Sequence, residues 1–361
     1  MRVFHILPTL VYGDAVSNDA RALNLILVEM GWRSRLYVAR TIPKFQGSLA
    51  FPVETLPQTF PDDVLVYHLS TGDALNERLI TLPGHKLIIY HNITPPCFFA
   101  PYNPAAAALT QQGYDQAAAL APYAEYCLAD SAYNAGELRR MGYTCPIDVV
   151  PILIPFEDYR RTPDAAVRQK YSDGRTNLLF VGRIAPNKRQ EDVIRAFDCY
   201  KKQYDATARL FLVGSYSVED PYYYSLRAYC KRLGVQDVIF PGHIRFEEIL
   251  AYYSIGDAFL CMSDHEGFCV PLVEAMCFGV PIVAKNTTAV GETMGAGGLL
   301  LPDNAPALAA AALHRLLQDD ALRAQIKAGQ QRRLADFSYE RVAQQFRESF
   351  GKFLAQIGQA Q

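Results

Sequence analysis

Two charged stretches in the second half of the chain carry residue types suited to binding an anionic ligand. In LLFVGRIAPNKRQEDVI, a predicted strand ends at Gly182, and Arg183 and Lys188 then flank a short loop before a predicted helix. Two cations at the beginning of a helix favour anion binding, because the helix dipole and the free amides of its first turn add to their charge. The stretch predicts a phosphate or diphosphate site, although two solvated loop cations explain the spacing about equally well.

The second stretch, DHEGFCVPLVEAMCFGVPIVA, places Glu266 and Glu274 in mostly apolar sequence. The preceding DAFLCM predicts a strand, and Pro271 and Gly279 predict where the following helix begins and ends. Glu266 is then a loop residue, and Glu274 lies about one turn into the helix. Amides at a helix beginning bind sugar or phosphate oxygens, and carboxylates accept hydrogen bonds from hydroxyls. The helix dipole alone also explains Glu274, but it explains Glu266 less well.

Short apolar runs alternate with longer segments of helical spacing, which is typical of parallel βα units. We expect an α/β fold with two Rossmann-like, doubly wound domains and a ligand cleft between them. The expected boundaries are 1–155 for the first domain, 156–173 for a proline-containing linker and 174–339 for the second domain, with a helix at 340–361 that packs back on the first. The predicted strands are 2–7, 33–39, 63–68, 86–91, 125–130, 176–182, 208–214, 238–242, 257–262 and 281–285.

Composition excludes several classes of protein. A chain of 361 residues exceeds what one hydrophobic core usually supports. Its net charge of −2 gives no support to a nucleic-acid partner. The eight cysteines include no Cys-x-x-Cys pair, which favours a reducing cytoplasm over a disulfide framework or a zinc site. No signal peptide and no apolar run of about 18 residues is found, so we expect a soluble cytoplasmic protein, compatible with weak peripheral contact with a membrane.

Together, the two charged stretches resemble the signature of the retaining glycosyltransferases of family 4, which have the GT-B fold. The family's Glu-x7-Glu motif stands here as Glu266 and Glu274, and Arg183 and Lys188 occupy the positions of its Arg and Lys. The resemblance extends from VFHILPTLVYGDA to the C-terminal helix. It implies that Arg183 and Lys188 neutralise the diphosphate of a nucleotide-sugar donor. It also implies that Glu266 holds hydroxyls of the sugar and Glu274 those of the ribose.

Further donor contacts in the second domain are implied by the same resemblance. The amides that follow Glu266 would contact the sugar and the phosphates, and the segment FPGHI would line the base pocket. The family usually has glycine where this chain has Cys269, so that amide is available only if the cysteine adopts an allowed backbone conformation. The residues concerned are Gly267, Phe268 and Cys269 for the amides, and His243 and Ile244 for the base.

In the first domain, KLIIYHNITPP places His91 and Asn92 at the end of a predicted strand. Alone, a histidine there is more often structural than functional, but it resembles the family's cleft histidine, which contacts the donor near the reacting sugar. LVYGDAVSND resembles the glycine-rich first loop of the family, reduced here to Gly13 after Tyr12. In LADSAYNAGEL, Ser131 is expected to cap a helix.

The resulting functional expectation is retaining transfer of a hexose from a nucleotide-diphosphate sugar to a glycan or lipid-linked glycan in polysaccharide biosynthesis. GDP-mannose is the expected donor by analogy with bacterial mannosyltransferases. The chain contains no Asp-x-Asp, so no metal site and no cofactor besides the donor are expected. Alternatives are a UDP-sugar transferase, a nucleotide-sugar 2-epimerase, a phosphorylase or a sugar-binding protein without turnover.

Overall fold

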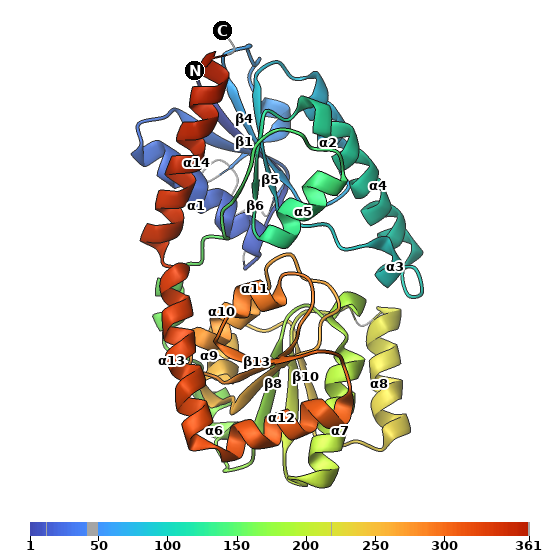
Figure 1. Cartoon of the computed structure of the whole chain (residues 1–361). Coiled ribbons are helices and arrows are strands. Elements are labelled where there is room, and N and C mark those ends of the chain that lie inside the picture. Colours follow the sequence, from blue (N-terminus) through green and yellow to red (C-terminus); the bar gives the residue numbers. More distant parts are fainter. Residues whose placement is uncertain (12, 42–49, 218, 360–361) are drawn as a thin grey trace. The chain divides into compact units, whose positions relative to one another are not determined.

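The computed structural model describes residues 1–11, 13–41, 50–217 and 219–359 of the chain. They form two compact units. Unit 1 comprises Met1–Cys97, Ala105–Pro155 and Phe337–Gln361, and unit 2 comprises Phe98–Pro104 and Phe156–Asp336. In each unit, helices cover both faces of a parallel sheet (Figure 1), which is the doubly wound α/β architecture predicted from the sequence.

The sheet of unit 1 has seven strands in the order β3-β2-β1-β4-β5-β6-β7, and all of its neighbouring strands pair in parallel. From β1 the chain adds strands first on one side and then, starting with β4, on the other. In open parallel sheets, ligands bind beyond the carboxyl ends of the strands at such a reversal, which here means β1 and β4. The strands are β1 (Val3–Leu10), β2 (Ser34–Thr41), β3 (Phe51–Pro52), β4 (Val64–Leu69), β5 (His85–Tyr90), β6 (Tyr126–Ala129) and β7 (Ile147–Val149).

Strand residues of unit 1 alternate between two apolar cores, as expected for a sheet covered on both faces. Phe4 and Leu65 pack in the core beneath α2, α4 and α5, whereas Val3 and Val64 pack in the core beneath α1 and α14. The helices are α1 (Ala15–Glu29), α2 (Ala74–Thr81), α3 (Pro96–Phe99), α4 (Pro104–Leu120), α5 (Ala132–Arg140) and α14 (Tyr339–Gln359), with short 3₁₀ turns η2 (Val53–Thr55) and η3 (Ala121–Tyr123).

Helix α14 is tied to unit 1 by an apolar stripe and a polar anchor. The stripe packs on β1, β4, β5 and β6 residues of the same core. The anchor is Asp148 in β7, whose Oδ2 accepts hydrogen bonds from Tyr126 Oη (2.9 Å), Ser349 Oγ (2.7 Å) and Lys352 Nζ (2.9 Å). The buried residues of the stripe are Val342, Ala343, Phe346, Phe350, Phe353 and Ile357.

The sheet of unit 2 has six parallel strands in the order β10-β9-β8-β11-β12-β13, so its strand order reverses between β8 and β11. Helices α7, α8 and α12 cover one core, and α9, α10 and α11 cover the other. The strands are β8 (Asn177–Val181), β9 (Arg209–Val213), β10 (Val238–Gly242), β11 (Ala258–Cys261), β12 (Ile282–Lys285) and β13 (Gly298–Leu301). The helices are α6 (Ala165–Tyr171), α7 (Gln190–Gln203), α8 (Pro221–Leu233), α9 (Phe246–Ile255), α10 (Val270–Cys277), α11 (Val290–Met294), α12 (Pro306–Gln318) and α13 (Asp320–Asp336), with 3₁₀ turns η4 (Phe156–Arg160) and η5 (Pro186–Lys188).

All ten predicted strands are present, and the structure adds β3, β7 and β13. These three lie at sheet edges, have two to four residues each and are only partly buried, so they lack the continuous apolar pattern of the central strands. Residues 156–173, expected as a linker, contain η4 and α6. Among the described residues, no helix is both long and apolar enough to cross a membrane.

The anchor of α14 gives a stability prediction that depends on pH. Burial alone would raise the pKa of Asp148, but its hydrogen bonds lower it below the ordinary value of 3.8. A carboxyl group with a lowered folded-state pKa stabilises the fold above its ordinary pKa and loses that contribution as the pH falls through the lowered value. We expect Asp148→Asn to reduce the unfolding free energy by about 1 kcal/mol at pH 7. The loss should shrink towards pH 3, as measured by urea unfolding.

The matched control is Asp115→Asn, which changes an exposed aspartate bonded only to Gln111, four residues away on α4. It should leave the unfolding free energy nearly unchanged at both pH values. A loss for Asp148→Asn that does not depend on pH would contradict the proposed charge on this anchor.

Candidate functional site

The loops that follow β8 and β11 meet where the strand order of unit 2 reverses. Lys188, the last residue of η5, extends its Nζ to Glu266 Oε2 at 2.5 Å. Glu266 is 6% exposed, and the Lys188 side chain is 19% exposed. Burial alone would lower the pKa of Lys188, but the Glu266 carboxylate outweighs it and raises the pKa, so the lysine stays charged. The structure therefore brings together one cation and one acid of the two predicted stretches.

Hydrogen bonds from three loops hold this ion pair in place. Asn187 Nδ2 donates to the carbonyl of His265 (3.1 Å), and the amide of Asp264 donates to the carbonyl of Asn187 (2.8 Å). From the loop after β12, Thr288 Oγ1 accepts from the amide of Glu266 (2.9 Å). Sequence reasoning missed Asn187 and Thr288, because polar loop residues carry no local signal of the distant loop that they will contact.

Arg183 differs from Lys188 in being exposed, and it forms no ion pair with any described residue. The first turn of α7 beside it carries two acids of its own, Glu191 and Asp192, and Arg189 pairs with both at 3.0 and 2.8 Å. The favourable end of the α7 dipole is therefore already occupied by protein carboxylates. An anion would therefore be attracted here by the cationic side chains more than by the N-terminus of α7.

Helix α10 begins directly after the loop that contains Gly267 and Phe268, with Cys269 as its N-cap residue. Cys269 has φ 75° and ψ 63°, the left-handed conformation that glycine adopts without strain. The cysteine thus keeps a glycine-like backbone despite its side chain. The Cys269 thiol lies with Cys261 Sγ and the Glu266 carboxylate in a buried group whose atoms are all within 4.8 Å of one another. A hydrogen bond with Cys261 and burial raise the pKa of Cys269 well above its ordinary value, so it is protonated.

Glu274, on α10, accepts a hydrogen bond at each carboxylate oxygen. Tyr159 of η4 donates to Oε1 (2.8 Å), and Tyr253 of α9 donates to Oε2 (2.7 Å). Burial raises the pKa of Glu274, while the two hydroxyls lower it in part. A carboxylate accepts about four hydrogen bonds, so two of its acceptor positions are not used by the tyrosines. Neither tyrosine was predicted, since they are 115 and 21 residues from Glu274 in sequence.

His243 and Ile244 follow β10, which is an edge strand separated from β8 by β9. His243 is exposed, whereas Ile244 is partly buried and packs against the core that contains α9 and α10. Gly242, before them, turns the chain with φ 83°. His243 and Ile244 therefore follow a strand that is two positions away in the sheet from β8, after which Lys188 lies.

In unit 1, the ring of His91 is fully buried and both of its nitrogens are hydrogen-bonded within the unit. Nδ1 contacts Asp130 Oδ2 (3.1 Å), and Nε2 contacts His68 Nδ1 (2.9 Å). Burial lowers the pKa of His91, but Asp130 outweighs it and raises the pKa to about 8. A donor contact from this ring would require one of these bonds to break, so the role expected for His91 stays a prediction.

Asn92 adopts φ 75° and points its side chain into the same unit, donating to Asn134 Oδ1 (3.0 Å) and Glu137 Oε2 (2.6 Å). The turn after β5 is thus held by hydrogen bonds within unit 1. Gly13, after β1, has φ 77°, and a Cβ added there would meet no atom within 4 Å; Tyr12 lies outside the described residues. Ser131 caps α5 as expected, accepting from the amide of Asn134.

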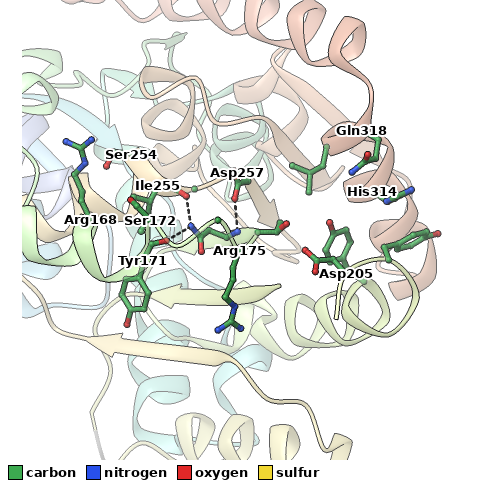
Figure 2. A pocket seen from close by; sticks show the side chains of 17 residues that line it. Arg168, Tyr171, Ser172, Arg175, Asp205, Ser254, Ile255, Asp257, His314 and Gln318 are labelled. Atoms are coloured by element: carbon green, nitrogen blue, oxygen red, sulfur yellow. Dashed lines mark hydrogen bonds between the residues drawn. The ribbon is translucent and has the colours of Figure 1, made fainter. Parts of the chain in front are cut away.

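A polar pocket of about 700 Å³ lies at the opposite, amino-terminal end of the unit 2 sheet (Figure 2). Asn177, the first residue of β8, donates there to the carbonyls of Tyr171 (3.3 Å) and Ile255 (2.9 Å). The backbone amide of Asn177 donates to Asp257 Oδ2 (2.7 Å). None of the predicted site residues lines this pocket, and its polar groups serve to join strand beginnings to α6 and α9.

The left-handed conformation of Cys269 gives a stability prediction. Cys269→Gly and Cys269→Ala both remove the thiol, but only glycine also removes the Cβ that disfavours this conformation. We expect the glycine variant to be more stable than the alanine variant by about 0.5 to 1 kcal/mol in urea unfolding. At Cys261, a strand residue, the order should reverse, because glycine weakens a strand interior. Equal stability of the two Cys269 variants would contradict the strain.

Several known proteins are similar to this chain in sequence or in fold. The family model described as "Glycosyl transferases group 1" matches residues 164–333. An O-antigen chain mannosyltransferase B of Escherichia coli is 28% identical over 228 residues, which is 62% of this chain and 59% of that protein. A GDP-mannose-dependent alpha-(1-6)-phosphatidylinositol monomannoside mannosyltransferase of Mycobacterium tuberculosis is 27% identical over 164 residues, which is 42% of this chain and 41% of that protein.

The chain thus spans about half the length of the curated relatives that it matches, at 59% and 41%. Among solved structures, a sucrose-phosphate synthase of Thermosynechococcus elongatus aligns with a TM-score of 0.77 and 18% identity. The alignment covers 98% of this chain and 100% of that one, and it shows the fold. The matched family model includes Arg183, Lys188, Glu266 and Glu274. Residues 164–333 therefore belong to the group 1 glycosyltransferase family, known as family 4, and the chain has the GT-B fold.

Proposed function

We propose that this protein transfers a hexose from a nucleotide-diphosphate sugar to an acceptor hydroxyl, with retention of anomeric configuration. The observation that carries the proposal is the Lys188–Glu266 ion pair at the point where the strand order of unit 2 reverses. A largely buried cation beside a carboxylate at the carboxyl end of a parallel sheet suits a ligand that has both phosphates and hydroxyls. Family membership supports the same reaction class.

The chemistry requires a stabilised diphosphate leaving group. Lys188 would bind the phosphates from its position between the loops after β8 and β11, and the exposed Arg183 would neutralise charge from the solvent side. Glu266 would then exchange part of its contact with Lys188 for hydroxyls of the donor sugar. With these fixed cations, we propose that the leaving group needs no metal ion. Retention can be tested by determining the anomeric configuration of the product by NMR.

The proposed donor is GDP-mannose. Two relatives are named as mannosyltransferases, and the name of one states dependence on GDP-mannose. A uridine-diphosphate sugar is the alternative donor, and a 2-epimerase of the same fold is the alternative reaction. The proposed acceptor is a growing glycan or lipid-linked glycan in the cytoplasm, in line with the O-antigen chain and phosphatidylinositol mannoside named for the same relatives.

Removal of either member of the ion pair tests the reaction assignment. We expect Lys188→Ala and Glu266→Ala each to reduce transfer by about 100-fold or more, because each removes a group aimed at the donor. The double variant should lose little more than either single variant, since the two residues act as a unit. Nucleotide release from the donor, measured with and without acceptor, separates transfer from epimerisation and from binding without turnover.

Lys202→Ala is the matched control, because Lys202 forms an exposed i,i+4 ion pair with Asp198 on α7. It should retain the wild-type rate. Since Lys188→Ala leaves Glu266 buried without its partner, the thermal midpoint of each variant must accompany its rate. Wild-type transfer by folded Lys188→Ala and Glu266→Ala variants would reject the proposed site.

The donor base is tested by thermal shift with GDP, UDP and ADP. A ligand that binds only the native state stabilises it by about 2.7 kcal/mol at 100 times its dissociation constant. We expect GDP to give the largest rise in melting temperature. Glu274→Ala should reduce the rise for all three nucleotides, because each carries the same ribose. A larger shift with UDP would replace the guanosine assignment, and no shift with any nucleotide would contradict a nucleotide-sugar donor.

A further inference from the structure

We propose that Asp19, His68 and His91 form a binding site in unit 1 for one transition-metal cation of the zinc class. One ligand atom from each residue can be chosen so that all three lie within 4.8 Å of one another. Two imidazoles and one carboxylate are a ligand set that binds zinc and its neighbours in the first transition series. The site does not depend on the Lys188–Glu266 pair of unit 2, but it includes His91, for which the sequence predicts a contact with the donor.

The three ligands come from separate elements of unit 1. Asp19 lies on α1, His68 near the carboxyl end of β4, and His91 directly after β5. Strands β1 and β4 are the pair at which the strand order of unit 1 reverses. The sheet thus holds His68 and His91, which are distant in sequence, and α1 holds Asp19. Ligands on helices and strands give a metal site the rigid support that it needs.

The two imidazoles already face each other at nearly the separation that a shared metal requires. His68 Nδ1 and His91 Nε2 are 2.9 Å apart. Two nitrogens bound at about 2.0 to 2.1 Å to one tetrahedral zinc ion stand about 3.3 Å apart. An outward movement of a few tenths of an ångström, with a rotation of both rings, would therefore let the two nitrogens bind one cation that lies beside the line joining them.

The outer groups of a metal site are also present. The other nitrogen of His91, Nδ1, contacts the buried carboxylate of Asp130 at 3.1 Å. The other nitrogen of His68, Nε2, contacts His5 Nδ1 at 3.0 Å. Asp19 Oδ1 accepts from the amide of Leu153 at 2.8 Å. Metal-binding histidines and carboxylates nearly always have such partners, which fix the orientation of each ligand.

Charge and burial favour a cation at this position. Asp19, Asp130 and all three histidines are at most 9% exposed, and the cluster contains two carboxylates and no lysine or arginine. Buried carboxylates need a positive counter-charge, which protons or a metal ion can supply. The second group of metal-ligand residues, Cys261, Glu266 and Cys269, differs, because Lys188 Nζ already occupies a position 2.5 Å from Glu266.

The experiment titrates Zn²⁺ and Co²⁺ into chelator-treated full-length protein. We expect one equivalent to bind, a rise in melting temperature with Zn²⁺, and the visible absorption of tetrahedral Co²⁺. Asp19→Asn, which keeps the shape of the side chain, and His68→Gln should abolish this binding. Asp130→Asn keeps all three ligands and should weaken affinity by about 10- to 100-fold.

Cys261→Ser/Cys269→Ser is the control that removes the second group of candidate ligands. Binding that persists in this double variant and is lost in Asp19→Asn supports the proposal. Binding that is lost in the double variant and kept in Asp19→Asn overturns it, and so does an absence of binding to the wild-type protein. Nucleotide thermal shifts on the same samples report on the transfer site separately, so failure of one proposal does not affect the other.

Discussion

The geometry of the candidate donor site depends on one largely buried ion pair, Lys188–Glu266. A charged side chain removed from water is destabilising unless a partner and further hydrogen bonds compensate it, so each member requires the other to be in place. This requirement extends to the loops that carry the two residues. Asn187, next to Lys188, and Thr288, beside Glu266, provide the hydrogen bonds that keep those loops in register.

The ion pair is also compatible with the ligand proposed for this place. The Lys188 side chain is partly exposed, and its charge is only partly satisfied by one carboxylate. A diphosphate that approaches from solvent can therefore compete for the ammonium group, while Glu266 becomes available to hydroxyls. Glu274 follows the same principle with neutral partners, because two tyrosine hydroxyls hold its carboxylate without using all of its acceptor positions.

Much of this arrangement could be predicted from the sequence, for physical reasons that differ between elements. The ten predicted strands were found because strands buried on both faces are continuous apolar runs, such as NLLFV in β8. Helix ends at Pro271, Gly279 and Ser131 were found because caps are local. Tyr159 and Tyr253 could not be predicted, because their contacts with Glu274 exist only after distant segments have folded together. The position of Cys269 could be predicted, but its φ of 75° could not, since cysteine rarely adopts that conformation.

The two sheets use the same topology in opposite ways. At the reversal point of unit 2, the polar side chains have unused hydrogen-bonding capacity that faces partly outward, as Lys188 and the exposed Arg183 illustrate. At the reversal point of unit 1, the polar side chains bond to one another in a buried chain that runs from His5 through His68 and His91 to Asp130. Because the ring of His91 and the side-chain amide of Asn92 are both hydrogen-bonded within unit 1, these side chains hold the turn after β5 in one conformation.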